Sequence, residues 1–304
     1  MKRIFSDFMR ALNNNSFVFT SEIEPKKTVN VEGIVNIAKK LKNYVIACNI
    51  TDNPRAHAYM NSIIASYIIQ KEAGMETICH MTVRDRNRLA LISDILGAYV
   101  LGIRNILAIT GDHTTMGDNP SALPVYDLDS TQFIKMVRRM IDEGVDLAGN
   151  KINGEIKMHI GAVGNPNANP LEPEIYKVRR KIMAGAEFIQ TQIVFDLDKA
   201  KRFIEEINAP PPYVLIGIFP CNSYKMADFI DKKIPGISVP AEYKEELRRA
   251  EGFKDKINEV NIEYFSEMIK ELRKTTRASG VHIMTIKYED IVCKIIENVK
   301  SIMN

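Results

Sequence analysis

The stretch FIQTQIVFD, residues 188–196, carries the pattern that decides the fold. It is a short apolar run, rich in Ile, Phe and Val, that ends in a polar side chain capable of chemistry, Gln192. The pattern recurs in FVFTSEIEP (17–25), YVIACNITD (44–52), ETICHMT (76–82), ILAITGDH (106–113), HIGAVGN (159–165) and IGIFPCN (216–222). Because parallel strands place all their carboxyl ends on one face of a barrel, these polar residues predict one shared rim.

Short apolar runs alternate with helical patterns along the chain. Strands are expected at 17–23, 44–50, 76–81, 105–109, 157–163, 188–192, 213–218 and 281–285, and helices at 31–42, 57–73, 86–101, 131–143, 173–184 and 198–207. Gly74, Gly102 and Gly144 follow three of the helices, as helix stops do. The alternation predicts an α/β protein, a closed (β/α)8 barrel forming a single domain over 1–304. An open doubly wound sheet is the weaker prediction, because the nucleotide-binding motifs GxGxxG and GxxxxGK[ST] are both absent from the sequence.

Composition narrows the class of protein. A chain of 304 residues that is 45% hydrophobic can bury one large core. The net charge of +3 gives no electrostatic case for nucleic acid. No apolar run is long enough to span a membrane, and residues 1–16 lack the apolar core of a signal peptide. The four cysteines lie far apart, which favours free thiols in a reducing cytoplasm, and the five histidines form no metal motif.

Two connections are longer than a barrel requires. Residues 111–130 follow the fourth strand with little apolar periodicity, and residues 219–256 follow the seventh with polar helical turns and the break KKIPGISVP. Long loops on a rigid scaffold commonly bind ligands or act as lids, although tolerated insertion is the simpler reading. A functional role is favoured for the first, since it opens with Asp112 directly after a strand.

Six segments, in their order, resemble the methylenetetrahydrofolate reductase family: TSEIEPKKT (20–28), TICHMT (77–82), ITGDHTTMGD (109–118), GNPNANPLEPE (164–174), RRKIMAGAEFIQTQIVFD (179–196) and GIFPCNSYK (217–225). The resemblance covers about 17–287, nearly the whole chain. It implies a flavin-containing (β/α)8 barrel that reduces 5,10-methylenetetrahydrofolate to 5-methyltetrahydrofolate by passing a hydride through the flavin. FAD is the family's usual flavin, with FMN the alternative. NADH, NADPH or a partner electron carrier would be the reductant, and an oligomer or a complex with a partner subunit is expected.

The resemblance assigns the chemistry to two carboxylates. Opening the substrate's five-membered ring needs a proton on N10, which a carboxylic acid with a raised pKa supplies. Glu22 matches the family's catalytic Glu, and Glu24, with the same strand parity, is its competitor. Asp112 matches an acidic residue beside the flavin and the pterin; otherwise it is a helix cap. The family pattern reads Arg–Gly–Asp there, whereas this chain has Thr110.

The remaining assignments follow the same resemblance. Substrate contacts are expected from Gln192, whose amide suits a pterin edge, and from Tyr224, at an aromatic stacking position. Cofactor contacts are expected from Thr51, His80, Gly111, Asp112, Asn165, Asn169, Lys177, Arg180 and Lys181. The three basic residues share one helix face, so a solvated surface is their simpler reading. Asn165 and Asn169 replace residues that relatives more often have as Tyr and His.

Two other functions are compatible with the same sequence. One is a non-catalytic, flavin-binding electron-transfer subunit of a larger redox complex. The other is a flavin-free barrel that binds methyltetrahydrofolate for corrinoid methyl transfer. The sequence does not choose between a role in methionine synthesis and one in carbon fixation or one-carbon catabolism.

Overall fold

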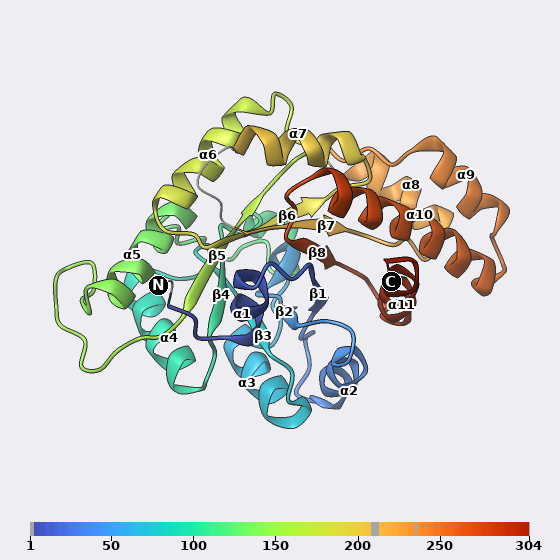
Figure 1. The fold of residues 1–304 in the computed structure, drawn as a ribbon. Coiled ribbons are helices and arrows are strands. Elements are labelled where there is room, and N and C mark those ends of the chain that lie inside the picture. Colours follow the sequence, from blue (N-terminus) through green and yellow to red (C-terminus); the bar gives the residue numbers. More distant parts are fainter. Residues whose placement is uncertain (1–2, 208–212, 235, 304) are drawn as a thin grey trace.

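The chain folds into one closed barrel of eight parallel strands in strict sequence order (Figure 1). The computed structural model describes residues 3–207, 213–234 and 236–303. The strands are β1 (Val18–Ile23), β2 (Ala47–Ile50), β3 (Thr77–Thr82), β4 (Asn105–Ile109), β5 (His159–Gly164), β6 (Phe188–Ile193), β7 (Tyr213–Ile218) and β8 (Gly280–Ile283). Pairing of β1 with β8 closes the ring, with Thr20 opposite His282. The predicted (β/α)8 barrel is therefore confirmed.

Helices cover the outside of this ring. They are α2 (Glu32–Leu41), α3 (Ser62–Ala73), α4 (Arg88–Val100), α5 (Ser130–Asp142), α6 (Glu172–Met183), α7 (Leu197–Ile207), α8 (Tyr224–Lys233), α9 (Ala241–Arg249), α10 (Lys254–Thr275) and α11 (Asp290–Met303). The segment after β7 supplies three of them, α8, α9 and α10, which gather on one side of the barrel (Figure 1). No helix in the described ranges is long and apolar enough to cross a membrane.

Two predicted bounds were too wide, and local hydrogen bonds explain both. The strand expected from Tyr44 begins only at Ala47, because the amides of Tyr44 and Val45 bond to the Leu41 carbonyl and finish α2. The helix expected from residue 57 begins at Ser62. The Asn61 side chain accepts bonds from two first-turn amides and so caps it there.

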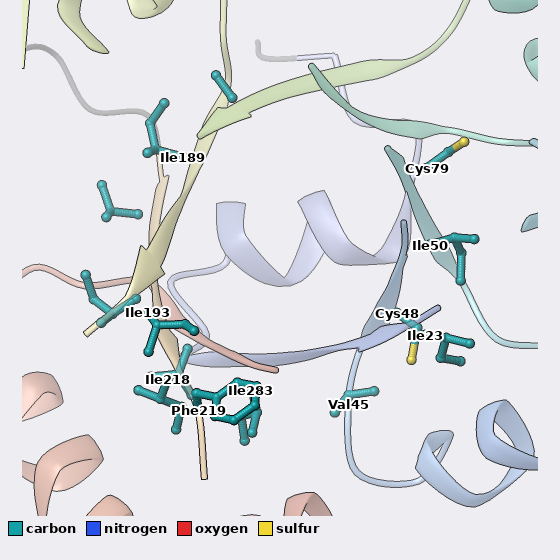
Figure 2. Packing of buried hydrophobic residues seen from close by; sticks show 14 of the residues in the cluster. Ile23, Val45, Cys48, Ile50, Cys79, Ile189, Ile193, Ile218, Phe219 and Ile283 are labelled. Carbon is teal, nitrogen blue, oxygen red and sulfur yellow. The ribbon is translucent and has the colours of Figure 1, made fainter. Parts of the chain in front are cut away.

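Most of the hydrophobic core lies between the strands and the helices. Alternate strand residues point away from the barrel axis, and Figure 2 shows Ile23, Ile50, Cys79 and Ile189 doing so, on the far side of the strands from the central helix. All four are at most 2% exposed. The strands read as nearly continuous apolar runs because this outer layer is mostly apolar.

A smaller cluster fills the amino-terminal end of the barrel. Helix α1 (Asp7–Asn13) lies across the centre of the ring, and Phe8, Met9 and Leu12 pack on inward-facing strand residues (Figures 1 and 2). Glu76 accepts hydrogen bonds from the amides of Asp7 and Phe8 at 2.8 and 3.0 Å, satisfying first-turn groups that have no helical partner. The helix therefore closes one end of the barrel and leaves the other, the carboxyl end, for a site.

The two long connections are built differently. The one after β4 holds only a single turn, η2 (Thr114–Met116), as its weak periodicity indicates. It lies against a second short turn, η1 (Pro54–Ala56), which follows β2. The connection after β7 is mostly helical, with α8, α9 and the first residues of α10. Pro235, in its KKIPGISVP break, lies outside the described residues.

Candidate active site

The middle of the barrel interior is polar, which is unusual because barrels of this type fill that space with branched apolar side chains. Five inward-facing residues make up this layer: Thr20, Asn49, His80, Gln190 and His282. Each is at most 8% exposed. Burial of a polar group destabilises a fold unless it is hydrogen-bonded, so their partners matter.

These five side chains are joined across the barrel. Asn49 Nδ2 lies 2.8 Å from His80 Nε2. The amides of Asn49 and Gln190 bond to each other at 2.5 and 3.1 Å. Gln190 Nε2 lies 3.4 Å from Thr20 Oγ1, which lies 3.0 Å from His282 Nδ1. A continuous chain of polar contacts thus runs from β3 to β8; we call it the interior chain.

Glu22 sits one layer above, at the carboxyl end of β1. Its side chain is 19% exposed, and Oε2 lies 3.9 Å from His282 Nε2. Burial raises the pKa of Glu22, but the contact with His282 and the nearby basic side chains of His80 and Arg55 outweigh it, so the pKa is lowered overall. The expectation of a raised pKa is therefore wrong, because basic groups from β3, β8 and η1 surround the carboxyl.

Glu24 lies just beyond the end of β1, and its carboxylate is paired with basic side chains. Its carboxylate forms ion pairs with Arg55, at 3.2 Å, and with Lys26. The two candidates that strand parity left equivalent therefore have different partners, Arg55 and Lys26 for Glu24 and His282 for Glu22.

Asp112 lies in the connection after β4, exposed on the rim. Its carboxylate accepts a hydrogen bond from the Arg55 amide at 2.9 Å, which ties the β4 connection to η1. Gly111 before it has a φ of +88°, and a Cβ there would lie 2.2 Å from Thr82 Oγ1. Only glycine fits, so the backbone at this point passes directly over the end of β3.

A buried arginine supports the same part of the rim. Arg84 follows β3, its side chain is 2% exposed, and Nη1 donates to the Asp112 carbonyl at 2.9 Å. It also forms an ion pair with Asp85 at 2.7 Å. A guanidinium therefore reaches the Thr110–Gly111–Asp112 turn from β3, although the sequence lacks an arginine at position 110.

Two predicted cofactor residues lie on neighbouring strands, Thr51 directly after β2 and His80 inside β3. Thr51 is 4% exposed and, among the described residues, its hydroxyl has no hydrogen-bond partner. Burial lowers the pKa of His80 to about 4, so its imidazole is neutral near neutral pH. An orphaned hydroxyl beside a neutral imidazole fits a polar ligand at this edge, since buried hydroxyls are normally paired.

The three basic residues of α6 do not behave as one group. Lys181 Nζ donates to the Val163 carbonyl at 2.7 Å, near the end of β5, and burial lowers its pKa. Lys177 is 67% exposed and lies 3.8 Å from Glu174. Arg180 is exposed on the same helix. Lys181 is thus the one of the three whose ammonium lies against the barrel strands.

The two asparagines after β5 have structural contacts of their own. Asn165 Oδ1 accepts from the Asn167 amide at 3.0 Å, and the Asn165 amide donates to Glu174 at 3.0 Å. Asn169 is exposed and lines a hollow of about 300 Å³ together with Asn167 and Lys199. The cofactor role of Asn165 and Asn169 stays a prediction.

The predicted substrate residues lie on two elements of the rim. Gln192 follows Gln190 by two residues in β6, so it faces the barrel mouth, where it is exposed. Its Oε1 accepts a hydrogen bond from the Ile193 backbone amide at 2.9 Å. Tyr224 begins α8, and the Arg248 guanidinium lies 4.2 Å above its ring. One face of the Tyr224 ring is therefore covered by Arg248.

Sequence reasoning missed most of the interior chain. Thr20, Gln190 and His282 were not singled out as site residues, and Arg84 was not considered. A usable signal was present: counting back two residues from Glu22 and from Gln192 gives Thr20 and Gln190 on the same barrel face. The pairing of these residues across the barrel has no signature in the sequence.

Fold and site together define a (β/α)8 barrel that α1 plugs at its amino-terminal end and that carries polar side chains across its middle. Methylenetetrahydrofolate reductase is the description of the family whose model matches residues 7–300. The chain belongs to this family, as the sequence segments predicted.

Individual relatives of this chain carry the same family description. A probable methylenetetrahydrofolate reductase (NADPH) of Caenorhabditis elegans is 23% identical, over 95% of this chain and 43% of that protein. Methylenetetrahydrofolate reductase 2 of Saccharomyces cerevisiae is 26% identical, over 75% and 37%. The chain thus spans less than half of these curated relatives. The 5,10-methylenetetrahydrofolate reductase of Pectobacterium carotovorum is 24% identical, over 70% and 65%.

A solved structure shares the fold. It is an uncharacterized Clostridium thermocellum protein described as binding two copies of 5-methyl-5,6,7,8-tetrahydrofolic acid. The TM-score is 0.65 at 18% identity, covering 98% of this chain and 100% of that one.

Proposed function

We propose that this protein reduces 5,10-methylenetetrahydrofolate to 5-methyltetrahydrofolate, with a flavin as hydride carrier and Glu22 as general acid. The observation that carries the proposal is the position of Glu22. It is the one partly buried carboxylate of β1 at the barrel mouth, it faces His282 and His80, and its neighbour Glu24 is held by two cations.

Residues at the mouth fit a flavin. The orphaned Thr51 hydroxyl lies at the end of β2, the neutral His80 lies inside β3, and Gly111 keeps the backbone close over the end of β3. Lys181, with Arg180 and Lys177 along the same helix, would hold phosphate. Asn165, Asn169 and the Asp112 turn would complete the contacts. When bound, the flavin supplies hydride transfer between the reductant and the folate.

Glu22 would deliver the proton that opens the substrate ring. In the free barrel its pKa is lowered, so near neutral pH it is mostly ionised. A ligand that covers the mouth excludes water and strengthens the burial that already raises this pKa. Glu22 would thus take up a proton with the substrate and give it to N10.

Asp112 and Gln192 would orient the folate. A carboxylate near a developing cationic iminium stabilises it, and Asp112 is fixed there by the Arg55 amide. The Oε1 of Gln192 is held by the Ile193 amide, and its Nε2 would donate to the acceptors of a pterin. Tyr224 would stack on the p-aminobenzoyl ring through the face opposite Arg248.

The reductant belongs to the proposal as well. NADH or NADPH, or a partner electron carrier, would reduce the flavin, FAD in the first instance and FMN as the alternative. An oligomer or a complex with a partner subunit, in a reducing cytoplasm, completes the proposal. The reducing compartment is supported by the four cysteines Cys48, Cys79, Cys221 and Cys293, which are all free and buried.

An absorption spectrum followed by anaerobic titration tests the function. We expect a flavin spectrum, bleaching by NADH or NADPH, and recovery when methylenetetrahydrofolate is added. Bleaching without recovery would instead indicate an electron-transfer subunit. Protein that neither carries nor takes up flavin would contradict the proposal and favour the methyl-transfer barrel.

A further inference from the structure

The interior chain has a direction, because an amide nitrogen only donates and an amide oxygen only accepts. Asn49 Nδ2 lies 2.8 Å from His80 Nε2, so His80 accepts there and carries its hydrogen on Nδ1. Asn49 and Gln190 satisfy each other's oxygen and nitrogen, which locks their relative orientation. Gln190 Nε2 then donates to Thr20 Oγ1.

The direction continues to the end of the chain. Thr20 Oγ1, having accepted from Gln190, is free to donate, and its nearest ring nitrogen is His282 Nδ1 at 3.0 Å. His282 Nδ1 is thereby an acceptor, so a neutral His282 carries its hydrogen on Nε2. That nitrogen is the one that faces Glu22 Oε2, 3.9 Å away.

The reverse direction fails at Glu22. Turning both amides over would make Gln190 accept from Thr20 and would put the His282 hydrogen on Nδ1. The bare Nε2 lone pair would then face the Glu22 carboxylate, and two acceptors repel each other. The ionised carboxylate therefore selects the direction in which Nε2 carries the hydrogen.

We propose that His282 is a positioning residue for Glu22: the interior chain fixes its imidazole as the Nε2–H tautomer and aims that hydrogen at the carboxylate. The present 3.9 Å is longer than a hydrogen bond, and such contacts commonly tighten only when substrate binds. This inference deepens the proposed function, on whose assignment of Glu22 it rests.

The role follows from where the proton goes. In the acid step the Glu22 O–H bond breaks, an N–H bond forms on the substrate nitrogen, and negative charge appears on the carboxylate. His282 keeps its own proton and stabilises that charge as it develops. Groups from three elements face Glu22, namely His282 from β8, His80 from β3 and Arg55 from η1. His80 accepts through Nε2 from Asn49, so it has no Nε2 hydrogen to offer.

The first test reads the tautomer directly and needs no turnover. Long-range nitrogen–proton NMR spectra of the protein with its bound flavin distinguish Nε2–H from Nδ1–H in neutral histidines. We expect Nε2–H for His282 and Nδ1–H for His80. Thr20→Val keeps the shape but removes the hydroxyl, so only the Glu22 carboxylate still favours Nε2–H and the share of the Nδ1–H tautomer of His282 should rise, whereas Thr20→Ser should preserve the wild-type spectrum. An Nδ1–H signal for wild-type His282 would overturn the proposal.

The second test reads the consequence for Glu22. His282→Phe removes the donor and leaves the burial, so the alkaline limb of the folate half-reaction should move up by about one pH unit. His282→Gln, which keeps an N–H near the position of Nε2, should restore the wild-type limb. An unchanged limb in His282→Phe would reject the positioning role.

The two tests fail separately from the proposed function. If the protein does not reduce methylenetetrahydrofolate, the proposed function fails, while the tautomers of His282 and His80 still decide the direction of the interior chain. If His282→Phe does not fold, the Thr20 pair decides it.

Discussion

Glu22→Gln separates acid catalysis from every other role of this position. The amide is nearly isosteric with the carboxyl, and the side chain is only 19% exposed, so the surroundings need little rearrangement. Gln can still hydrogen-bond but cannot deliver a proton to N10. Reduction of the flavin by a nicotinamide needs orientation and no protein acid, so that half-reaction should stay within a few-fold of wild type.

The folate half-reaction should be slowed by the 10²–10⁴-fold typical of a lost general acid, about 3–5.5 kcal/mol in the activation barrier. Glu24→Gln is the matched control. It removes a carboxylate two residues away whose partners are Arg55 and Lys26, and such rim ion pairs contribute about 0–1 kcal/mol to stability. Its folate half-reaction should be nearly unchanged.

Anaerobic stopped flow, following flavin absorbance in each half-reaction separately, makes the measurement. Normal reoxidation by folate in Glu22→Gln together with slow reoxidation in Glu24→Gln would show that Glu24 is the acid. Normal reoxidation in both variants would place the acid elsewhere on the rim. Equal slowing of both half-reactions by Glu22→Gln would mean that the substitution disturbs the site rather than the proton transfer.

Four further predictions concern the cofactor and the fold. Asp112→Asn should raise the flavin reduction potential, because reduced, anionic flavin loses a nearby like charge; an unchanged potential in a dye titration would favour a capping role. Neutralising Arg180 and Lys181 together should weaken flavin retention on dialysis, and unchanged occupancy would reject their phosphate role. The folded-state pKa of His80, about 4, lies below its unfolded value of 6.5, so stability should fall as pH drops through this window; His80→Asn should flatten that fall in urea titrations at stepped pH, and an equal fall in both proteins would contradict it. Phe8→Ala should lower the free energy of unfolding by about 3–5 kcal/mol, since Phe8 is 0% exposed and packs edge-on against Phe188; a loss under 1 kcal/mol would show that α1 is not an essential plug.

Element order and type could be read from the sequence because they depend on local patterns. Each buried strand can be recognised as a short run rich in Ile, Val and Phe, and each helix by the spacing of its apolar residues. The predicted ends of helices and strands were wrong where a hydrogen bond that the hydrophobic pattern does not reveal sets them, as at Asn61 and at the end of α2. Strand parity also placed Glu22 and Glu24 on the same face of their strand without any structure.

Only the tertiary structure decided which of those inward residues work together. Parity left Glu22 and Glu24 equal, and the ion pairs of Glu24 with Arg55 and Lys26 separate them. The lowered pKa of Glu22 depends on His282 from β8 and His80 from β3, which are distant from Glu22 in sequence. Sequence by itself determined the barrel and the face that carries the site, since both follow from periodicities of a few residues. The interior chain links residues up to 262 positions apart, and closure of the barrel is what brings Thr20 within hydrogen-bond distance of His282.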